Sequence, residues 1–156
     1  MKLQKRMGFT GILVLSFIGF FVFQAHAVKR TLGDLLPIYV SIQEALARDD
    51  LKEAIHQTQL LQKESKNLES QDLKRIESAL VGISSSTQIS DARKEFKNLS
   101  LPFAEWVLKN PNAKLSAMYC PMANAKWVQK EGKTLNPYYG KSMLGCGEKI
   151  SKKDAP

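Results

Sequence analysis

The sequence has 156 residues, of which 44% are hydrophobic and 24% charged, with a formal net charge of +8. This length fits one domain with a substantial core. Beyond the first residues, Lys and Arg are interspersed with Asp and Glu, and there is neither a basic block nor an aromatic-basic stretch. The charge therefore indicates a solvated surface and gives no support to nucleic-acid binding.

The first 27 residues have the three parts of a secretory signal. Positive residues at positions 2, 5 and 6 precede the apolar run "MGFTGILVLSFIGFFVF", and "AHA" at 25–27 supplies small residues for a signal peptidase. We expect cleavage after Ala27, which leaves residues 28–156 as a single periplasmic or secreted domain with no membrane span. An uncleaved N-terminal anchor is the alternative. Lipoprotein processing is not indicated, because no cysteine follows the apolar run.

Apolar residues recur at three- and four-residue intervals between positions 34 and 110, as in amphipathic helices. We expect helices from Asp34 to Asp49, from Asp50 to about Leu68, after Ser70, and from about Ile89 to Asn110. Four such helices with short connections predict a mainly α protein, with an up-and-down four-helix bundle over residues 34–110.

Local signals refine these predicted helices. Pro37 is expected in the first turn of its helix, where a missing N–H is harmless. Asp50 and Glu53 have the spacing of a capping box. The stretch "GISSSTQIS" predicts a loop, and Pro102 is expected to kink or restart the last helix.

The segment from 113 to 150 lacks helical periodicity and carries both cysteines. We expect short strands near 115–120 and 126–129. "NPYYG" predicts a turn in which Asn136 bonds forward to its own backbone, Pro137 fixes φ and Gly140 tolerates a positive φ. The aromatic residues are expected to form a small core that joins this segment to the helices, against Trp106: Tyr119, Trp127, Tyr138 and Tyr139.

After the signal, every sulfur atom lies within residues 118–146: Met118, Cys120, Met122, Met143 and Cys146. Pro121 favours an extended backbone at Cys120, so the first three side chains would share one face of a strand. One helical turn would bring Met143 and Cys146 to a common side. Thiolate and thioether together select Cu(I) over harder ions. We therefore expect a copper site with Cys120, Met122, Met143 and Cys146 as ligands and Met118 as an auxiliary ligand.

Two other interpretations stay open for the cysteines. In an oxidising compartment, Cys120 and Cys146 would ordinarily form a disulfide, which stabilises by roughly 3–4 kcal/mol in the chain-entropy model. The second interpretation is a thiol pair that cycles between the reduced and the disulfide state, as in a redox chaperone. Zinc ranks below copper, because His56 is the one histidine after the signal and lies in the second predicted helix.

Nothing in the sequence indicates an enzyme. There is no nucleophile–base–orienter set, no pair of carboxylates in a loop and no phosphate-binding glycine motif. A thiol oxidoreductase would ordinarily carry its cysteines as Cys-x-x-Cys, whereas these two are far apart.

The motifs "YCPMANAKWVQ", "NPYYG" and "ML" followed by "CG" closely resemble bacterial domain-of-unknown-function family 3347. "LPIYVSIQEALARDD" and "DARKEFKNLS" resemble helices of the same family, so the resemblance extends over nearly all of residues 28–156. That family occurs as exported single domains and is attached to periplasmic adaptor subunits of heavy-metal efflux systems.

The resemblance implies a context of copper- or silver-type efflux, with an efflux adaptor or another envelope protein as partner. Cys-Pro-Met is also similar to a motif of a second, small heavy-metal-binding domain of such pumps. That domain has a histidine where this sequence has Ala123, and its second Cys-x-x-Cys is reduced here to Cys146-Gly147. We expect an exported soft-metal binding protein; the alternative is a disulfide-closed interaction module that docks on an envelope protein.

Overall fold

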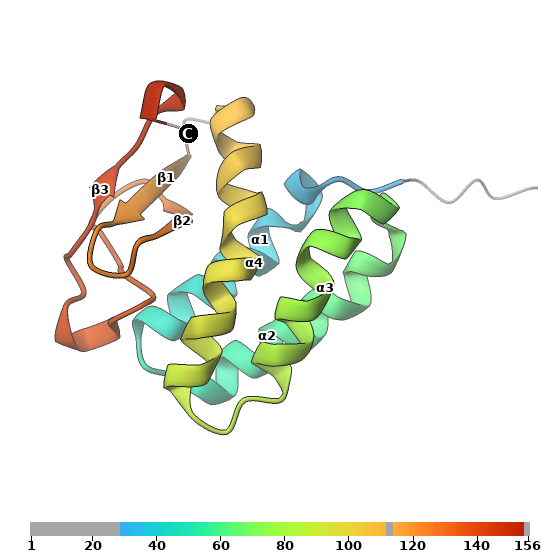
Figure 1. The fold of residues 1–156 in the computed structure, drawn as a ribbon, viewed down its shortest axis with the longest axis horizontal. Helices are drawn as coiled ribbons and strands as arrows, with labels where there is room; N and C mark the ends of the chain where they lie inside the picture. Colours follow the sequence, from blue (N-terminus) through green and yellow to red (C-terminus); the bar gives the residue numbers. More distant parts are fainter. Residues whose placement is uncertain (1–28, 112–113, 155–156) are drawn as a thin grey trace, which may run out of the picture.

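Four α-helices are followed by a small antiparallel sheet in the computed structural model, which describes residues 29–111 and 114–154 (Figure 1). The predicted signal, residues 1–27, lies outside the described residues. Within the described ranges, no helix has both the length and the apolar character needed to cross a membrane.

The mainly helical prediction is confirmed, with one helix for each predicted segment. Each helix packs against the next in the chain, and the first also packs against the fourth. Their inward faces are apolar and buried, as the three- and four-residue spacing predicts. The bounds are α1 Leu32–Ala47, α2 Leu51–Glu64, α3 Ser70–Ser84 and α4 Ile89–Lys109.

The first helix begins two residues before the predicted start, because Thr31 caps it. The Asp34 carboxylate accepts hydrogen bonds from the Thr31 backbone N–H at 2.8 Å and from the Thr31 hydroxyl at 2.9 Å. These bonds lower the pKa of Asp34. Pro37 consequently lies in the second turn of α1, and its predicted place in the first turn was wrong. Pro102 lies inside α4, which continues through it without restarting.

The other helix boundaries follow from local polar contacts. Asp50 caps α2 as predicted, since its side chain accepts the Glu53 N–H at 3.0 Å. The loop between α3 and α4 is shorter than "GISSSTQIS". The helix α3 continues past Gly82 to Ser84. The hydroxyls of Ser85 and Ser86 donate to the carbonyls of Val81 and Gly82 and so satisfy the last turn.

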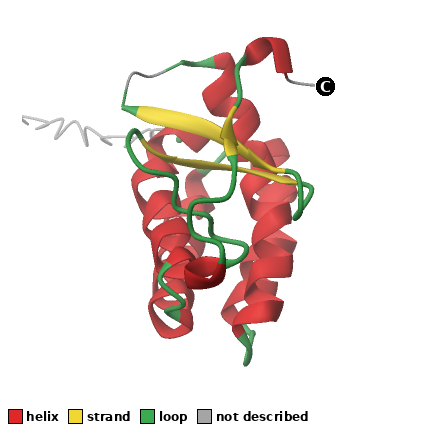
Figure 2. Cartoon of the chain, turned by 90° about the vertical axis from the view of Figure 1, so that its left-hand side faces the viewer, coloured by secondary structure: helices red, strands yellow, loops and turns green. Residues whose placement is uncertain are grey.

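The sheet lies across one side of the helices, with strand order β2-β1-β3 (Figure 2). Its strands are β1 Leu115–Cys120, β2 Ala125–Lys130 and β3 Glu148–Lys149. The first two confirm the predicted strands. The third was not predicted: it has two residues, and its extended conformation comes from pairing with Met118 and Tyr119 of β1.

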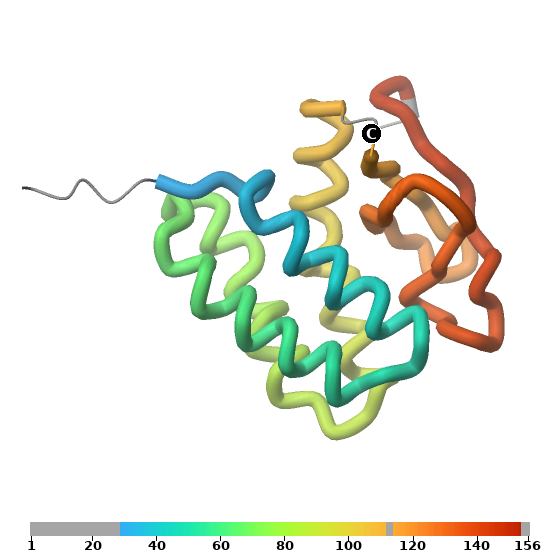
Figure 3. Tube along the Cα trace, turned by 180° about the vertical axis from the view of Figure 1, so that it is seen from behind, coloured from blue at the N-terminus to red at the C-terminus, as the bar shows by residue number. Residues whose placement is uncertain are grey.

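Helices α1 and α4 contact the sheet, whereas α2 and α3 lie on the far side of them (Figures 1 and 3). Tyr39 of α1 is central to this contact: its ring stacks on Phe96 and Phe103, and its hydroxyl accepts the Val128 N–H at 3.1 Å. The Tyr39 hydroxyl also shares a hydrogen bond with Ser100. Burial raises its pKa well above the usual range, so the hydroxyl stays neutral.

Two aromatic residues of the sheet side join this core. The buried Tyr138 ring lies 6.0 Å from Phe96 and, edge-on, 6.0 Å from Trp127. Tyr119 and Tyr139 are only half-buried. Within the described residues, none of these rings stacks on Trp106 as expected. The Trp106 ring lies over Gly33 of α1 instead.

Candidate thiol site

The two cysteines lie next to each other although 26 positions separate them in the sequence. Antiparallel pairing of Tyr119 with Glu148 places the residues just before β3 beside the end of β1, where Cys120 lies. Cys120 is wholly buried, Cys146 is half-buried, and both are free thiols. Partial burial, followed by the neighbouring Cys120, raises the pKa of the Cys146 thiol. The Asn136 side-chain nitrogen bonds to both residues, so the two cysteines are close neighbours.

The Cys120 sulfur accepts two N–H groups. Strand β1 ends at Cys120, and residues 121–124 form a turn that returns the chain into β2. This turn brings the Ala123 backbone N–H to 3.4 Å from Cys120 Sγ. The Asn136 side chain donates to the same sulfur at 3.3 Å.

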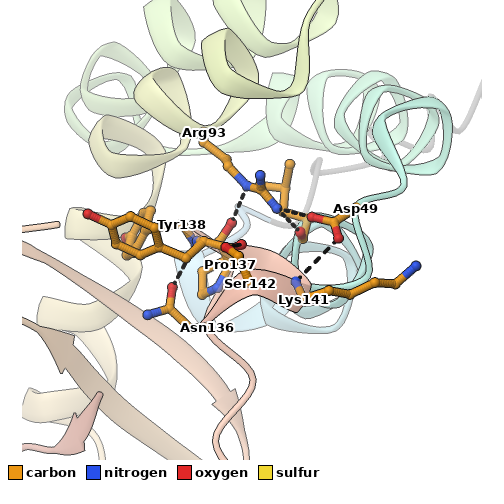
Figure 4. Close-up of polar contacts among 9 residues, drawn as sticks. Asp49, Arg93, Asn136, Pro137, Tyr138, Lys141 and Ser142 are labelled. Carbon is orange, nitrogen blue, oxygen red and sulfur yellow. Dashed lines mark hydrogen bonds and ion pairs between the residues drawn. The ribbon is translucent and has the colours of Figure 1, made fainter. Parts of the chain in front are cut away.

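Asn136 is the residue that connects the two cysteines. Its side chain is fully buried, and its amide nitrogen donates both to Cys120 Sγ and, at 2.7 Å, to the Cys146 carbonyl. Its side-chain oxygen accepts the backbone N–H groups of Tyr138 at 2.8 Å and Tyr139 at 3.3 Å (Figure 4). This is the forward bond expected of the "NPYYG" turn.

A charged pair holds the same turn: Arg93 of α4 and Asp49 of the connection between α1 and α2 (Figure 4). Arg93 of α4 donates to the Pro137 carbonyl at 2.9 Å and to Asp49 at 2.5 Å. Asp49 also accepts the Lys141 N–H at 3.2 Å. The Arg93 bond, followed by that of Lys141, lowers the Asp49 pKa. At Gly140, φ is +56°, and an added Cβ would lie 2.0 Å from Asp49 Oδ1. Only glycine permits this close approach.

The three methionines are placed differently from one another. Met118 is buried and, two residues before Cys120 in β1, lies on the same strand face. Met122 was expected on that face too, but this was wrong because the strand ends at Cys120; Met122 lies in the turn with 62% of its surface exposed. Met143 is half-buried, and its carbonyl accepts the Cys146 N–H at 3.0 Å.

Harder ligands do not gather around the sulfur atoms. Among the residues that the structure describes, no group of three or more His, Cys, Asp or Glu side chains is placed to hold an ion. His56 is exposed on α2, with Nδ1 3.7 Å from Glu53. Two adjacent thiols can bind a soft ion or oxidise to a disulfide.

Sequence reasoning did not find the contact between Asn136 and the sulfur, or the roles of Arg93 and Asp49. "NPYYG" had drawn attention to Asn136 as a turn residue only. Its amide reaches Cys120 through the tertiary fold, across 16 positions. In the sequence, no local pattern distinguishes Arg93 and Asp49 from the other charged surface residues.

A family model described as "Protein of unknown function (DUF3347)" matches residues 35–114. The match includes all of α2, α3 and α4 and nearly all of α1, and it stops just before β1. The sulfur-bearing motifs therefore lie outside the matched residues. No curated protein and no solved structure matches the sequence.

Proposed function

The chain belongs to the DUF3347 family of proteins of unknown function, and we propose that it is an exported, periplasmic protein that binds a soft, copper-type metal ion. In this proposal Cys120 and Cys146 hold Cu(I), and the protein buffers the ion or passes it on in heavy-metal handling or efflux. The helices, arranged as an up-and-down bundle, are the scaffold. The observation that carries the proposal is that two free cysteines meet where β3 pairs with the end of β1, close enough for the Asn136 side-chain nitrogen to bond to both.

The chemistry of the pair supports a soft ion over a hard one. Thiolate sulfur is the ligand type that favours Cu(I), and two thiolates suffice for an ion that accepts low coordination numbers. The N–H groups of Ala123 and Asn136 support this assignment, because outer-shell donors to a ligating thiolate offset its charge. Cys146, half-buried, gives the ion a way in.

The methionines complete the proposed site in different roles. Met143 belongs to the same turn as Cys146, and Met122 follows Cys120 by two residues in an exposed turn. Both thioethers are therefore close enough in the chain to serve as further ligands after a side-chain movement. Met118, buried on the strand face of Cys120, is the auxiliary ligand.

A second candidate rests on the same contact between thiols. Closure of a Cys120–Cys146 disulfide would fasten the irregular segment to β1 and give a rigid module that docks on an efflux adaptor or another envelope protein. No catalytic role is proposed in either case.

The deciding experiment measures copper and thiols in the same samples. The full chain is expressed with export in copper-replete cells, and copper per protein is determined beside an anaerobic Cu(I) competition titration. We expect one tightly bound Cu(I), lost in Cys120→Ser and Cys146→Ser and kept in the control His56→Asn. A protein indifferent to copper that shows a two-proton mass loss under non-reducing conditions would support the disulfide module instead.

A further inference from the structure

The positive charge of the protein is concentrated in the part that forms the sheet. Residues 29–108 contain 11 basic and 12 acidic residues, whereas residues 109–154 contain nine lysines and three acidic residues. No short stretch is strongly basic, so the imbalance becomes visible only when the two parts are compared. Such an excess favours an anionic partner where the fold gathers the lysines on one surface.

Two adjoining hollows lie at the end of the molecule where α4 ends and β1 begins (Figure 1). The smaller, of about 500 Å³, lies between the end of α4 and strands β1 and β3, and the larger, of about 840 Å³, between α1, α4 and the start of β1. Leu115 and Glu131 line both hollows. We call the residues that line them the Leu115 surface.

The floor of the Leu115 surface is apolar. In the larger hollow the Trp106 ring lies over Gly33, where an added Cβ would be 2.3 Å from its Cζ2 atom. The ring therefore lies low against the backbone of α1 and belongs to the floor. The other floor residues are buried or half-buried side chains: Leu36, Val40, Val107, Leu108 and Ile150.

Lysines surround this floor. Glu131 is the one carboxylate among the described lining residues, and Lys149 Nζ lies 2.5 Å from it, which offsets its charge. Five of the nine lysines of residues 109–154 line the two hollows: Lys109, Lys114, Lys130, Lys149 and Lys152.

Lys109 and Lys152 leave positive charge available to a partner. Both are exposed, and neither has an acidic partner within the described part of the chain. They lie on the rim of the smaller hollow, next to its apolar floor. A ligand that is both acidic and apolar would therefore satisfy this surface better than a simple anion.

The shape of the surface selects the class of partner. Its lysines are exposed at the rim while its large apolar side chains are recessed, so a flat bilayer would meet the lysines alone. A convex protein segment can place apolar side chains in the hollows and carboxylates on the rim. The large apolar residues that the described chain exposes lie outside both hollows: Leu60, Val81, Leu101 and Met122.

We propose that the Leu115 surface is a docking site for an acidic amphipathic segment of another protein. Apolar side chains of that segment enter the hollows on either side of Leu115, and its carboxylates pair with Lys109 and Lys152. The inference goes beyond the proposed function and does not require the ion, because neither cysteine lines either hollow.

The test selects peptides from a random display library on the full chain, immobilised at low salt. We expect the enriched peptides to combine Asp or Glu with large apolar residues. The strongest binder, made synthetically, should bind the double variant Lys109→Gln/Lys152→Gln about fivefold more weakly, and the deficit should shrink at high salt. Leu115→Thr, which keeps a β-branched residue in the strand, should weaken binding about tenfold at either salt concentration. If Leu115→Thr fails to fold by circular dichroism, the lysine variant decides.

Lys63→Gln/Lys74→Gln is the matched control, since it removes the same charge from exposed positions of α2 and α3 and should bind like wild type. A selection that enriches no peptide, or peptides that bind every variant equally well, would overturn the proposal. Lysine-dependent sedimentation with phosphatidylglycerol vesicles in place of peptide binding would overturn it too and assign the surface to a membrane. If the peptides bind as expected to a protein that is indifferent to copper, the proposed function fails and this docking site stands.

Discussion

The Asp49 carboxylate and the Arg93 guanidinium lie 2.5 Å apart, although 44 positions separate them in the sequence. Asp49 follows α1 with φ of +63°, and Arg93 lies in α4. Both also bond to the backbone of the turn that carries Asn136, through Pro137 and Lys141. The pair therefore couples the helices to the thiol site.

We expect Asp49→Asn to destabilise the protein by about 1 kcal/mol at pH 7, the scale of one partly exposed charged hydrogen bond. Asparagine tolerates the positive φ, so backbone strain is not added. Because folding lowers the Asp49 pKa, its contribution is present above the unfolded value of about 4 and is lost as the pH falls through the folded value. The wild-type advantage should therefore shrink from pH 7 to about pH 3.

Urea unfolding at both pH values measures this difference in the free energy of unfolding. Glu77→Gln, an exposed carboxylate in the middle of α3, is the control and should change little at either pH. If the free energy of unfolding of Asp49→Asn differs from wild type by the same amount at both pH values, the loss of the carboxylate charge is not the cause.

Gly140→Ala should cost at least about 2 kcal/mol, because it combines a left-handed backbone with a collision against the Asp49–Arg93 pair. The added Cβ would lie 2.0 Å from Asp49 Oδ1 and 2.2 Å from Arg93 Nη2. Gly145→Ala, five residues on in the same segment, has open space around its Cβ and no positive φ, so it should be nearly neutral. Thermal unfolding compares them, and equal losses in both variants would count against this account.

The helices were predictable because their signals are local. The 3.6-residue spacing and the Asp50 cap are both visible in short stretches, and α4 begins at Ile89 as predicted. The start of α1 was missed because Thr31 and Asp34 form their own cap. Strand β3 could not be foreseen, since two residues carry no pattern and tertiary pairing alone makes them extended.

The site was partly predictable for the same physical reason. Cysteines and methionines are recognisable by type, so Cys120 and Cys146 could be named as a candidate pair from the sequence. What surrounds the sulfur depends on contacts between distant segments. The Asn136 amide reaches Cys120 only because the "NPYYG" turn is folded back over the end of β1, and no spacing rule encodes that contact.

Replacing each methionine by leucine, a change of similar volume, should rank their roles in the proposed ion site. If Met122 and Met143 are ligands, each substitution weakens Cu(I) binding about tenfold without a matching loss of stability, because Met122 is exposed and Met143 half-buried. Met118→Leu should weaken binding less and affect stability more, since Met118 is in the core. Competition titrations and urea unfolding give both quantities. Unchanged affinity in all three variants would reduce the site to the two thiols.

The chain contains two tryptophans, and only one of them adjoins the thiol site. The Trp127 ring lies directly on Gly147, where an added Cβ would be 2.3 Å from its Cη2 atom, and Gly147 follows Cys146. Trp106 lies over Gly33 instead. Because Gly147 follows Cys146 directly, we expect ion binding or disulfide closure at Cys146 to alter the surroundings of the Trp127 ring and therefore its emission.

Single-tryptophan variants separate the two signals. In Trp106→Phe, which keeps Trp127, we expect emission at short wavelength, because the ring is fully buried, and a clear intensity change on adding Ag(I) as a redox-inert soft ion or on oxidation with glutathione disulfide. In Trp127→Phe, the remaining Trp106 should respond to neither. The Cys120→Ser substitution, combined with Trp106→Phe, should abolish the response, because it removes the sulfur that anchors both reactions. A response carried by Trp106, or one that persists without Cys120, would place the reactive event away from the end of β1.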